Sequence, residues 1–99
     1  MTSNFINSTN KWPLEGVKVL DLGQIYNGPY AGFLLAHAGA DVVKVEPLSG
    51  EILRERGGGE VPLSFAMLNT NKRGITINLK ESKGKELLLK LAGEADVLL

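Results

Sequence analysis

Two short, almost wholly apolar segments enclose a helical pattern in the first half of the chain, and this arrangement limits the possible folds more than any other feature. The segments are VKVLDLG (17–23) and DVVKVE (41–46), and PYAGFLLAHA (29–38) lies between them. Strands with so few polar residues are typical of parallel sheets that are covered on both faces. A strand, a helix and a strand within thirty residues predict a βαβ unit with parallel strands and a right-handed crossover.

The predicted helix has recognisable ends and one apolar face. Pro29 suits the start of a helix, where its missing N–H costs nothing, and Gly39 suits the left-handed position that follows one. The expected buried face consists of residues that recur at helical spacing: Tyr30, Phe33, Leu34 and Ala38.

The second half continues the alternation of strands and helices. After a break at 47–60, in which Gly57, Gly58 and Gly59 predict a mobile loop that closes over a ligand, Pro62 opens a short helical turn over 62–68. The predicted elements that follow are a strand with Ile75, Ile77 and Leu79 on one face, a helix capped by Ser82 with Leu87, Leu88 and Leu91 buried and Gly93 at its end, and a strand from Val97. The sequence therefore predicts an alternating α/β sheet of the nucleotide-binding type.

Length and composition exclude several classes of function. The 99 residues, 43% of them apolar, predict one domain over residues 13–99 after a flexible N-terminus at 1–12. Eleven basic and eleven acidic residues argue against a nucleic-acid or anionic-membrane partner. The absence of cysteine excludes disulfides and thiolate metal sites. We expect no metal, and the polar first dozen residues and the lack of a long apolar stretch predict neither a signal peptide nor a membrane span. We expect a soluble, cytoplasmic protein, truncated at 99 because ADVLL (95–99) is typical of a strand that is only beginning.

Two loops contain candidate ligand-binding residues. GQIYNGPY (23–30) follows the first strand, where Gly28 and Pro29 either expose backbone N–H groups to an anion or simply make a tight turn. NTNKRG (69–74) places Lys72 beside Arg73, a pair that either is solvated or grips a phosphate. Lys80 is a candidate for a further contact with a phosphate or with the edge of an adenine. Neither loop matches a G-x-G-x-x-G or P-loop pattern.

Other polar residues have ordinary structural explanations. His37, the single histidine, lies in the first helix without a partner motif, so helix packing or solvent exposure is favoured over catalysis. Asp21 and Glu46 end strands, where an acid either binds a ribose or, more commonly, caps a turn. LRER (53–56) is expected to form a surface charge patch.

Three blocks of the sequence, in order and in register from Pro13 to Leu99, resemble the family III CoA-transferases, which include formyl-CoA and carnitine CoA-transferases and α-methylacyl-CoA racemase. The blocks contain VLDL with a following GP, LLAHAGADVVKVEP, and LNTNKR. The resemblance implies the N-terminal part of a Rossmann-like large domain, coenzyme A (CoA) as ligand, and an interlocked homodimer. It also implies covalent catalysis by an aspartate carboxylate that lies beyond Leu99.

The resemblance further implies where CoA binds. The family's contacts that fall within this chain map onto Tyr26, Asn27, Pro47, Ile77, Asn78, Leu79 and Lys80. Lys72 and Arg73 are expected to add positive potential for the CoA phosphates. Oxalate-specific formyl-CoA enzymes have glutamine at the position of Tyr26 and arginine at that of Pro47, so this sequence does not support oxalate as the substrate.

The predicted function is a CoA-transferase that moves CoA between an acyl-CoA and a carboxylic acid, of which these residues form the CoA-binding segment and are inactive alone. One alternative is an acyl-CoA racemase of the same family, in which a base removes the proton beside the thioester carbonyl. Another is a CoA-binding module without turnover.

Overall fold

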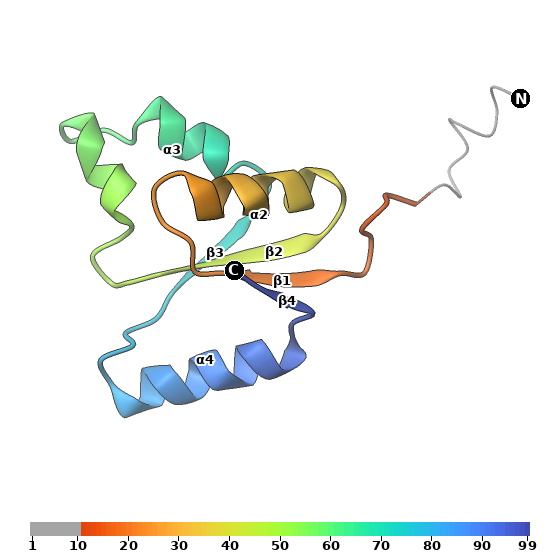
Figure 1. Cartoon of the computed structure of the whole chain (residues 1–99). Helices are drawn as coiled ribbons and strands as arrows, with labels where there is room; N and C mark the ends of the chain where they lie inside the picture. Colours follow the sequence, from red (N-terminus) through yellow and green to blue (C-terminus); the bar gives the residue numbers. More distant parts are fainter. Residues whose placement is uncertain (1–10) are drawn as a thin grey trace, which may run out of the picture.

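A four-stranded sheet between helices is the framework of the computed structural model, which describes residues 11–99 (Figure 1). Of the flexible segment predicted for residues 1–12, residues 1–10 lie outside the described residues. In chain order the elements are β1 (Lys18–Asp21), α2 (Asn27–His37), β2 (Asp41–Glu46), the 3-10 helix η1 (Ile52–Gly57), α3 (Leu63–Leu68), β3 (Arg73–Thr76), α4 (Ser82–Glu94) and β4 (Val97–Leu98).

The strands are ordered β3-β2-β1-β4, and every neighbouring pair is parallel. This order equals the first four strands of the doubly wound dinucleotide-binding sheet. It confirms the predicted Rossmann-like α/β class and the parallel pairing of the first two strands. Because all strands run the same way, their carboxyl ends meet at one edge, which is where such sheets bind ligands.

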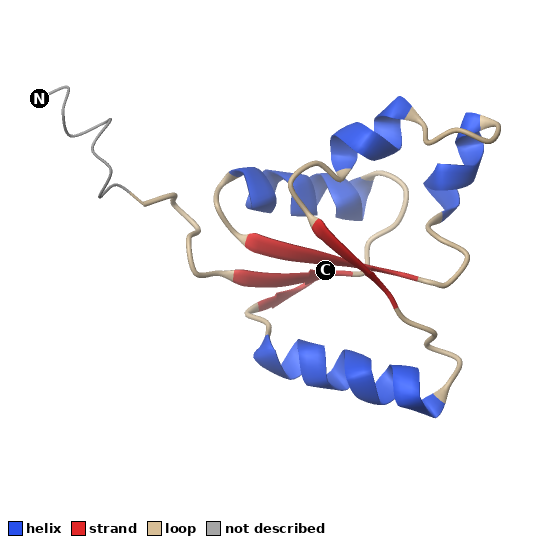
Figure 2. Ribbon diagram, turned by 180° about the vertical axis from the view of Figure 1, so that it is seen from behind, coloured by secondary structure: helices blue, strands red, loops and turns tan. Residues whose placement is uncertain are grey.

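Helices cover both faces of the sheet, with α2 and α3 on one face and α4 on the other (Figures 1 and 2). The α2 face buries a cluster of small and β-branched residues: Val19, Ala36, Ala40 and Val42. On the α4 face, Leu20, Val45 and Ile77 are buried, with Leu88 and Leu91 packed against them. Alternation along each strand therefore separates the apolar interior into two layers.

The predicted buried face of α2 is wrong in part. Tyr30 and Leu34 are about half exposed, whereas Pro29, Gly32 and Ala36 are the buried residues of this helix. Gly32 and Ala36 also recur at helical spacing, and their small size lets the helix backbone approach the sheet closely. Spacing alone could not distinguish this face from the bulkier one beside it.

Details of the second half also differ from the sequence predictions. Ser82 is the first residue of α4 rather than its cap, the cap position is Glu81 without a side-chain bond, and the helix extends past Gly93 to Glu94. Leu87 is about half exposed, outside the packed stripe. Part of the predicted loop at 47–60 is helical as η1, and Gly58 follows it with φ of 63°, a conformation that suits glycine.

We predict that Gly84→Ala destabilises the fold, because a Cβ at this buried site would overlap the carbonyl oxygen of Asn78. The expected loss is about 1–3 kcal/mol of unfolding free energy, typical of overpacking. Gly93→Ala is the matched control in the same helix, because its added Cβ meets no atom within 4 Å and should stabilise the helix by about 0.5–1 kcal/mol. Urea denaturation of both variants measures the difference, and equal effects would contradict the prediction.

Candidate functional site

A pocket of about 200 Å³ lies at the carboxyl edge of the sheet, next to the last residues of β1, β2 and β3. Pro47, Ile77, Asn78, Leu79 and Lys80 line it, together with Leu22, Gln24, Val45 and Glu46. The structure thus brings together two of the three predicted segments of CoA contacts. The pocket volume is below the about 300–1,000 Å³ that small-molecule sites usually enclose.

The lining of this pocket combines apolar and polar residues. Ile77 is buried in the α4-side layer and fixes the start of the segment that follows β3. Asn78 then folds that segment back, because its Oδ1 accepts a hydrogen bond from the Lys80 N–H at 3.1 Å. Lys80 is exposed and makes no ion pair with the described residues. Such a surface suits a ligand that is partly apolar and partly anionic.

The third predicted segment, Tyr26 and Asn27, lies where the loop after β1 enters α2, with Tyr26 just before the helix and Asn27 as its first residue, and neither lines the pocket. Both are exposed. The loop closes on itself where a Cβ on Gly23 would lie 2.7 Å from the Cα of Gly28. Gly28 therefore serves a close backbone contact within the turn, which is the structural alternative that the sequence left open.

Lys72 directs its ammonium group into the protein rather than towards the edge. Its Nζ donates to Asp21 Oδ2 at 2.9 Å, to the Pro29 carbonyl oxygen at 2.8 Å and to Asn69 Oδ1 at 2.9 Å. The side chains of both Lys72 and Asp21 are almost completely buried. Burial lowers the pKa of Lys72, and the hydrogen bond with Asp21 opposes that shift. All three ammonium protons are thus used inside the fold.

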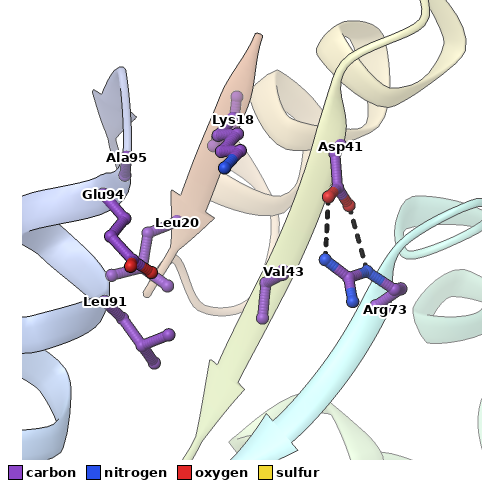
Figure 3. A pocket seen from close by; sticks show the side chains of 9 residues that line it. Lys18, Leu20, Asp41, Val43, Arg73, Leu91, Glu94 and Ala95 are labelled. Atoms are coloured by element: carbon purple, nitrogen blue, oxygen red, sulfur yellow. Dashed lines mark hydrogen bonds and ion pairs between the residues drawn. The ribbon is translucent and has the colours of Figure 1, made fainter. Parts of the chain in front are cut away.

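Arg73 forms an ion pair away from the carboxyl edge. It donates two hydrogen bonds to Asp41, the first residue of β2, at 3.0 and 2.7 Å, and Figure 3 shows this pair beside Lys18 and Val43. The Arg73 side chain is largely exposed and that of Asp41 is about half exposed. The structure therefore does not bring Arg73 together with the segment Ile77–Lys80, and its role towards CoA stays a prediction.

A second charged cluster lies at the end of β2 on the α2 face. Glu46 Oε2 accepts the N–H of Glu51 at 2.8 Å, and Arg54 grips both Glu46 oxygens at 2.7 and 2.8 Å. The hydrogen bond from Arg54 is the main cause that lowers the pKa of Glu46, and burial opposes it. Glu46 thus has the turn-capping role considered for a strand-end acid, and Arg54 belongs to this cluster as well as to the surface.

Sequence reasoning missed Lys44 and Glu51, which are buried beneath the same loops. Lys44 Nζ donates to the Gly23 carbonyl oxygen at 3.0 Å and lies 3.4 Å from Glu51 Oε1. The available signal was a lysine inside the otherwise apolar strand DVVKVE, because a charge in a buried strand requires a partner. With them, three cations and three carboxylates are balanced at this edge: Asp21, Lys44, Glu46, Glu51, Arg54 and Lys72.

Within residues 11–99, no group of three or more histidine, cysteine, aspartate or glutamate side chains could hold a metal ion. No helix in that range is long and apolar enough to cross a bilayer.

We predict that Lys72→Met lowers the unfolding free energy by about 3–5 kcal/mol, because it leaves the Asp21 carboxylate buried without its cation. Its neighbour supplies the control. Arg73→Met breaks an exposed pair and should cost no more than about 1 kcal/mol. Urea or thermal denaturation compares the two variants, and a similar cost for both would show that Lys72 does not have the buried role described.

The Glu46–Arg54 pair predicts a pH dependence. The pKa of Glu46 is lowered in the folded state, so the pair stabilises the protein above the unfolded pKa of about 4.5 and loses its effect as the pH falls through the folded pKa. Relative to wild type, Arg54→Met should therefore cost about 1 kcal/mol at pH 7, with a difference that shrinks towards pH 3. Arg56→Met, in the same helix, is the control, and a pH-independent cost for Arg54→Met would refute the pairing.

Comparison with known proteins relates this geometry to a family. Residues 14–99 match CoA-transferase family III. A formyl-CoA:oxalate CoA-transferase from Streptomyces avermitilis shares 49% identity over 86% of this chain, and one from Escherichia coli shares 45% identity over 87%. The matched residues span 22% of the length of each relative.

Solved structures agree with the sequence relatives. A CAIB/BAIF family protein from Brucella suis shares 38% identity with a TM-score of 0.84, over 90% of this chain and 25% of its own. A hypothetical protein from Mycobacterium tuberculosis shares 38% identity with a TM-score of 0.82, over 89% and 25%. The match of the family pattern to nearly all described residues, together with these identities, shows that the chain belongs to CoA-transferase family III.

Proposed function

We propose that this chain binds CoA at the carboxyl edge of its sheet, as part of an enzyme that moves CoA between an acyl-CoA and a carboxylic acid. The observation that carries the proposal is the pocket formed by Pro47 and Ile77–Lys80 at the strand ends, in a chain that belongs to a CoA-transferase family. Parallel sheets of this order bind nucleotide ligands at that edge.

The pocket lining fits the two kinds of surface that CoA presents. Leu22, Val45 and Ile77 supply apolar contact for the adenine ring or the pantetheine chain. Lys80 supplies a cation at the rim for a phosphate. Tyr26 and Asn27 would contact the ligand from the start of α2, outside the residues that line the pocket.

The charges of Lys72 and Arg73 have intramolecular partners, so their contribution to CoA binding is proposed as an electrostatic one. Arg73 is the accessible member of the two, since Lys72 is buried. A largely exposed ion pair is worth little and is easily exchanged for another anion. Direct phosphate contact is therefore assigned to Lys80, and Arg73 is tested separately below.

The reaction itself requires groups outside these residues. We propose that an aspartate beyond Leu99 attacks the acyl-CoA thioester, and that the complete enzyme is a cytoplasmic, interlocked homodimer. The relatives from Streptomyces avermitilis and Escherichia coli have formyl-CoA and oxalate in their names. Tyr26 and Pro47 differ from the residues expected of oxalate-specific enzymes, so the acyl group and the acceptor are left open.

We predict that Lys80→Ala weakens binding of CoA to the complete protein about fivefold, equivalent to about 1 kcal/mol for an exposed charge pair. Isothermal titration with CoA measures the affinity. Lys90→Ala removes another exposed lysine, on α4, and should leave the affinity unchanged. If Lys80→Ala binds CoA as tightly as wild type, Lys80 is not part of the site. Arg73→Met, measured in the same titration, tests whether Arg73 contributes to CoA affinity.

An exchange assay tests the activity. The complete protein is incubated with a series of acyl-CoA donors and carboxylic acid acceptors, with oxalate among them, and the new thioesters are identified by mass spectrometry. Formation of the acceptor's CoA thioester supports the proposal. Racemisation of a 2-methylacyl-CoA without exchange would show that the protein is a racemase and not a transferase. CoA binding without turnover would show that it is a CoA-binding module.

A further inference from the structure

A carboxylate from a distant segment holds the loop that precedes α2. Glu51 Oε1 accepts the backbone N–H of Ile25 at 2.6 Å, across 26 positions of the sequence. Ile25 has φ of 67°, a left-handed conformation that is rare for a β-branched residue. The loop therefore adopts an unfavourable backbone at the residue that receives this hydrogen bond.

Glu51 is itself fixed in place before it reaches the loop. Its side chain is 2% exposed, and its own N–H donates to Glu46 Oε2 at 2.8 Å. Glu46 is in turn held by Arg54, whose Nε and Nη2 donate to its two carboxylate oxygens. The carboxylate thus extends from a rigid support at the end of β2 to the loop at the end of β1.

Neutralisation of Lys44 is the alternative explanation for a buried glutamate. Glu51 Oε1 lies 3.4 Å from Lys44 Nζ but only 2.6 Å from the Ile25 nitrogen, so the shorter and stronger contact is the one to the loop. Oε2 has no hydrogen-bond partner among the described residues. Both contacts are made by Oε1, and the contact with the loop is the closer of the two.

Ile25 is followed directly by Tyr26, the residue before α2, and by Asn27, the first residue of α2, so the backbone conformation at Ile25 sets the path by which the chain reaches both. We propose that Glu51 is a positioning residue for CoA binding: it touches no ligand and holds Ile25 in the conformation that presents Tyr26 and Asn27. This inference rests on the proposed function, because contact of CoA with Tyr26 and Asn27 is part of it.

The test compares substitutions of Glu51 in the complete protein by titration with CoA. Glu51→Met has similar length but no acceptor, and its affinity should fall about tenfold. Glu51→Gln keeps an acceptor oxygen without the charge and should stay within about threefold of wild type. Glu86→Met, an exposed glutamate on α4, is the control and should change nothing.

A second substitution distinguishes positioning from general damage. Ile25→Gly removes the steric cost of the left-handed conformation, because glycine adopts positive φ readily. It should restore part of the affinity lost in Glu51→Met while it changes wild type little, a non-additive result that marks coupled residues. Amide hydrogen exchange at Ile25, measured without ligand, should accelerate in Glu51→Met and stay near the wild-type rate in Glu51→Gln and Glu86→Met.

Lys44 loses its carboxylate partner in Glu51→Met, and that variant could fail to fold. In that case Lys44→Met is combined with Glu51→Met or with Glu51→Gln. Neither combination leaves a lysine charge unpaired, and they differ in the acceptor for Ile25. Lys44→Met with Glu51→Met should bind CoA about tenfold more weakly than Lys44→Met with Glu51→Gln.

Equal CoA affinity of Glu51→Met and wild type, or an Ile25 amide that exchanges at the wild-type rate in that variant, would overturn the positioning role. A wild-type protein that binds no CoA would instead overturn the proposed function, together with the ligand part of this inference. Because amide exchange needs no ligand, the two failures are distinguishable.

Discussion

The buried ion pair of Lys72 and Asp21 is the interaction on which the carboxyl edge depends. It joins the end of β1 to the turn before β3, and a further bond from Lys72 reaches the first turn of α2. Removing two charges from water is costly, and here the ammonium recovers that cost only because all three protons are bonded. Gly32 is a consequence, since a Cβ there would lie 2.7 Å from Asp21 Oδ2.

This interaction changes the meaning of the basic turn NTNKRG. Side-by-side cations at a strand entrance suggest a phosphate site, yet the two side chains diverge and serve opposite ends of the sheet. The balanced cluster of six charges fixes the loops after β1 and β2 without adding net charge. The proposed binding of an anionic ligand would therefore use a few accessible groups, such as Lys80, on a frame that ion pairs already hold together.

Much of the fold could be predicted because it depends on local pattern. Apolar strands, Pro29 near a helix start and Gly39 with φ of 105° at its end are properties of short segments, and they defined the parallel α/β sheet. The candidate pocket followed from the family resemblance and the rule that strand ends bind ligands. The buried side of α2 could not be predicted in the same way, because Tyr30 and Gly32 both fit helical spacing. Only contact with the sheet decides which of the two is buried.

The sequence by itself determined the order of strands and helices, their parallel pairing and the family, since these depend on periodicity and on motifs within a few tens of residues. Tertiary structure alone decided which partner each charge takes. Lys72 and Asp21 are 51 positions apart, and Glu51 meets Ile25 across 26. The energy of an ion or a hydrogen bond depends on burial and on distances of a few ångströms, and neither quantity is encoded in the spacing of residues along the chain.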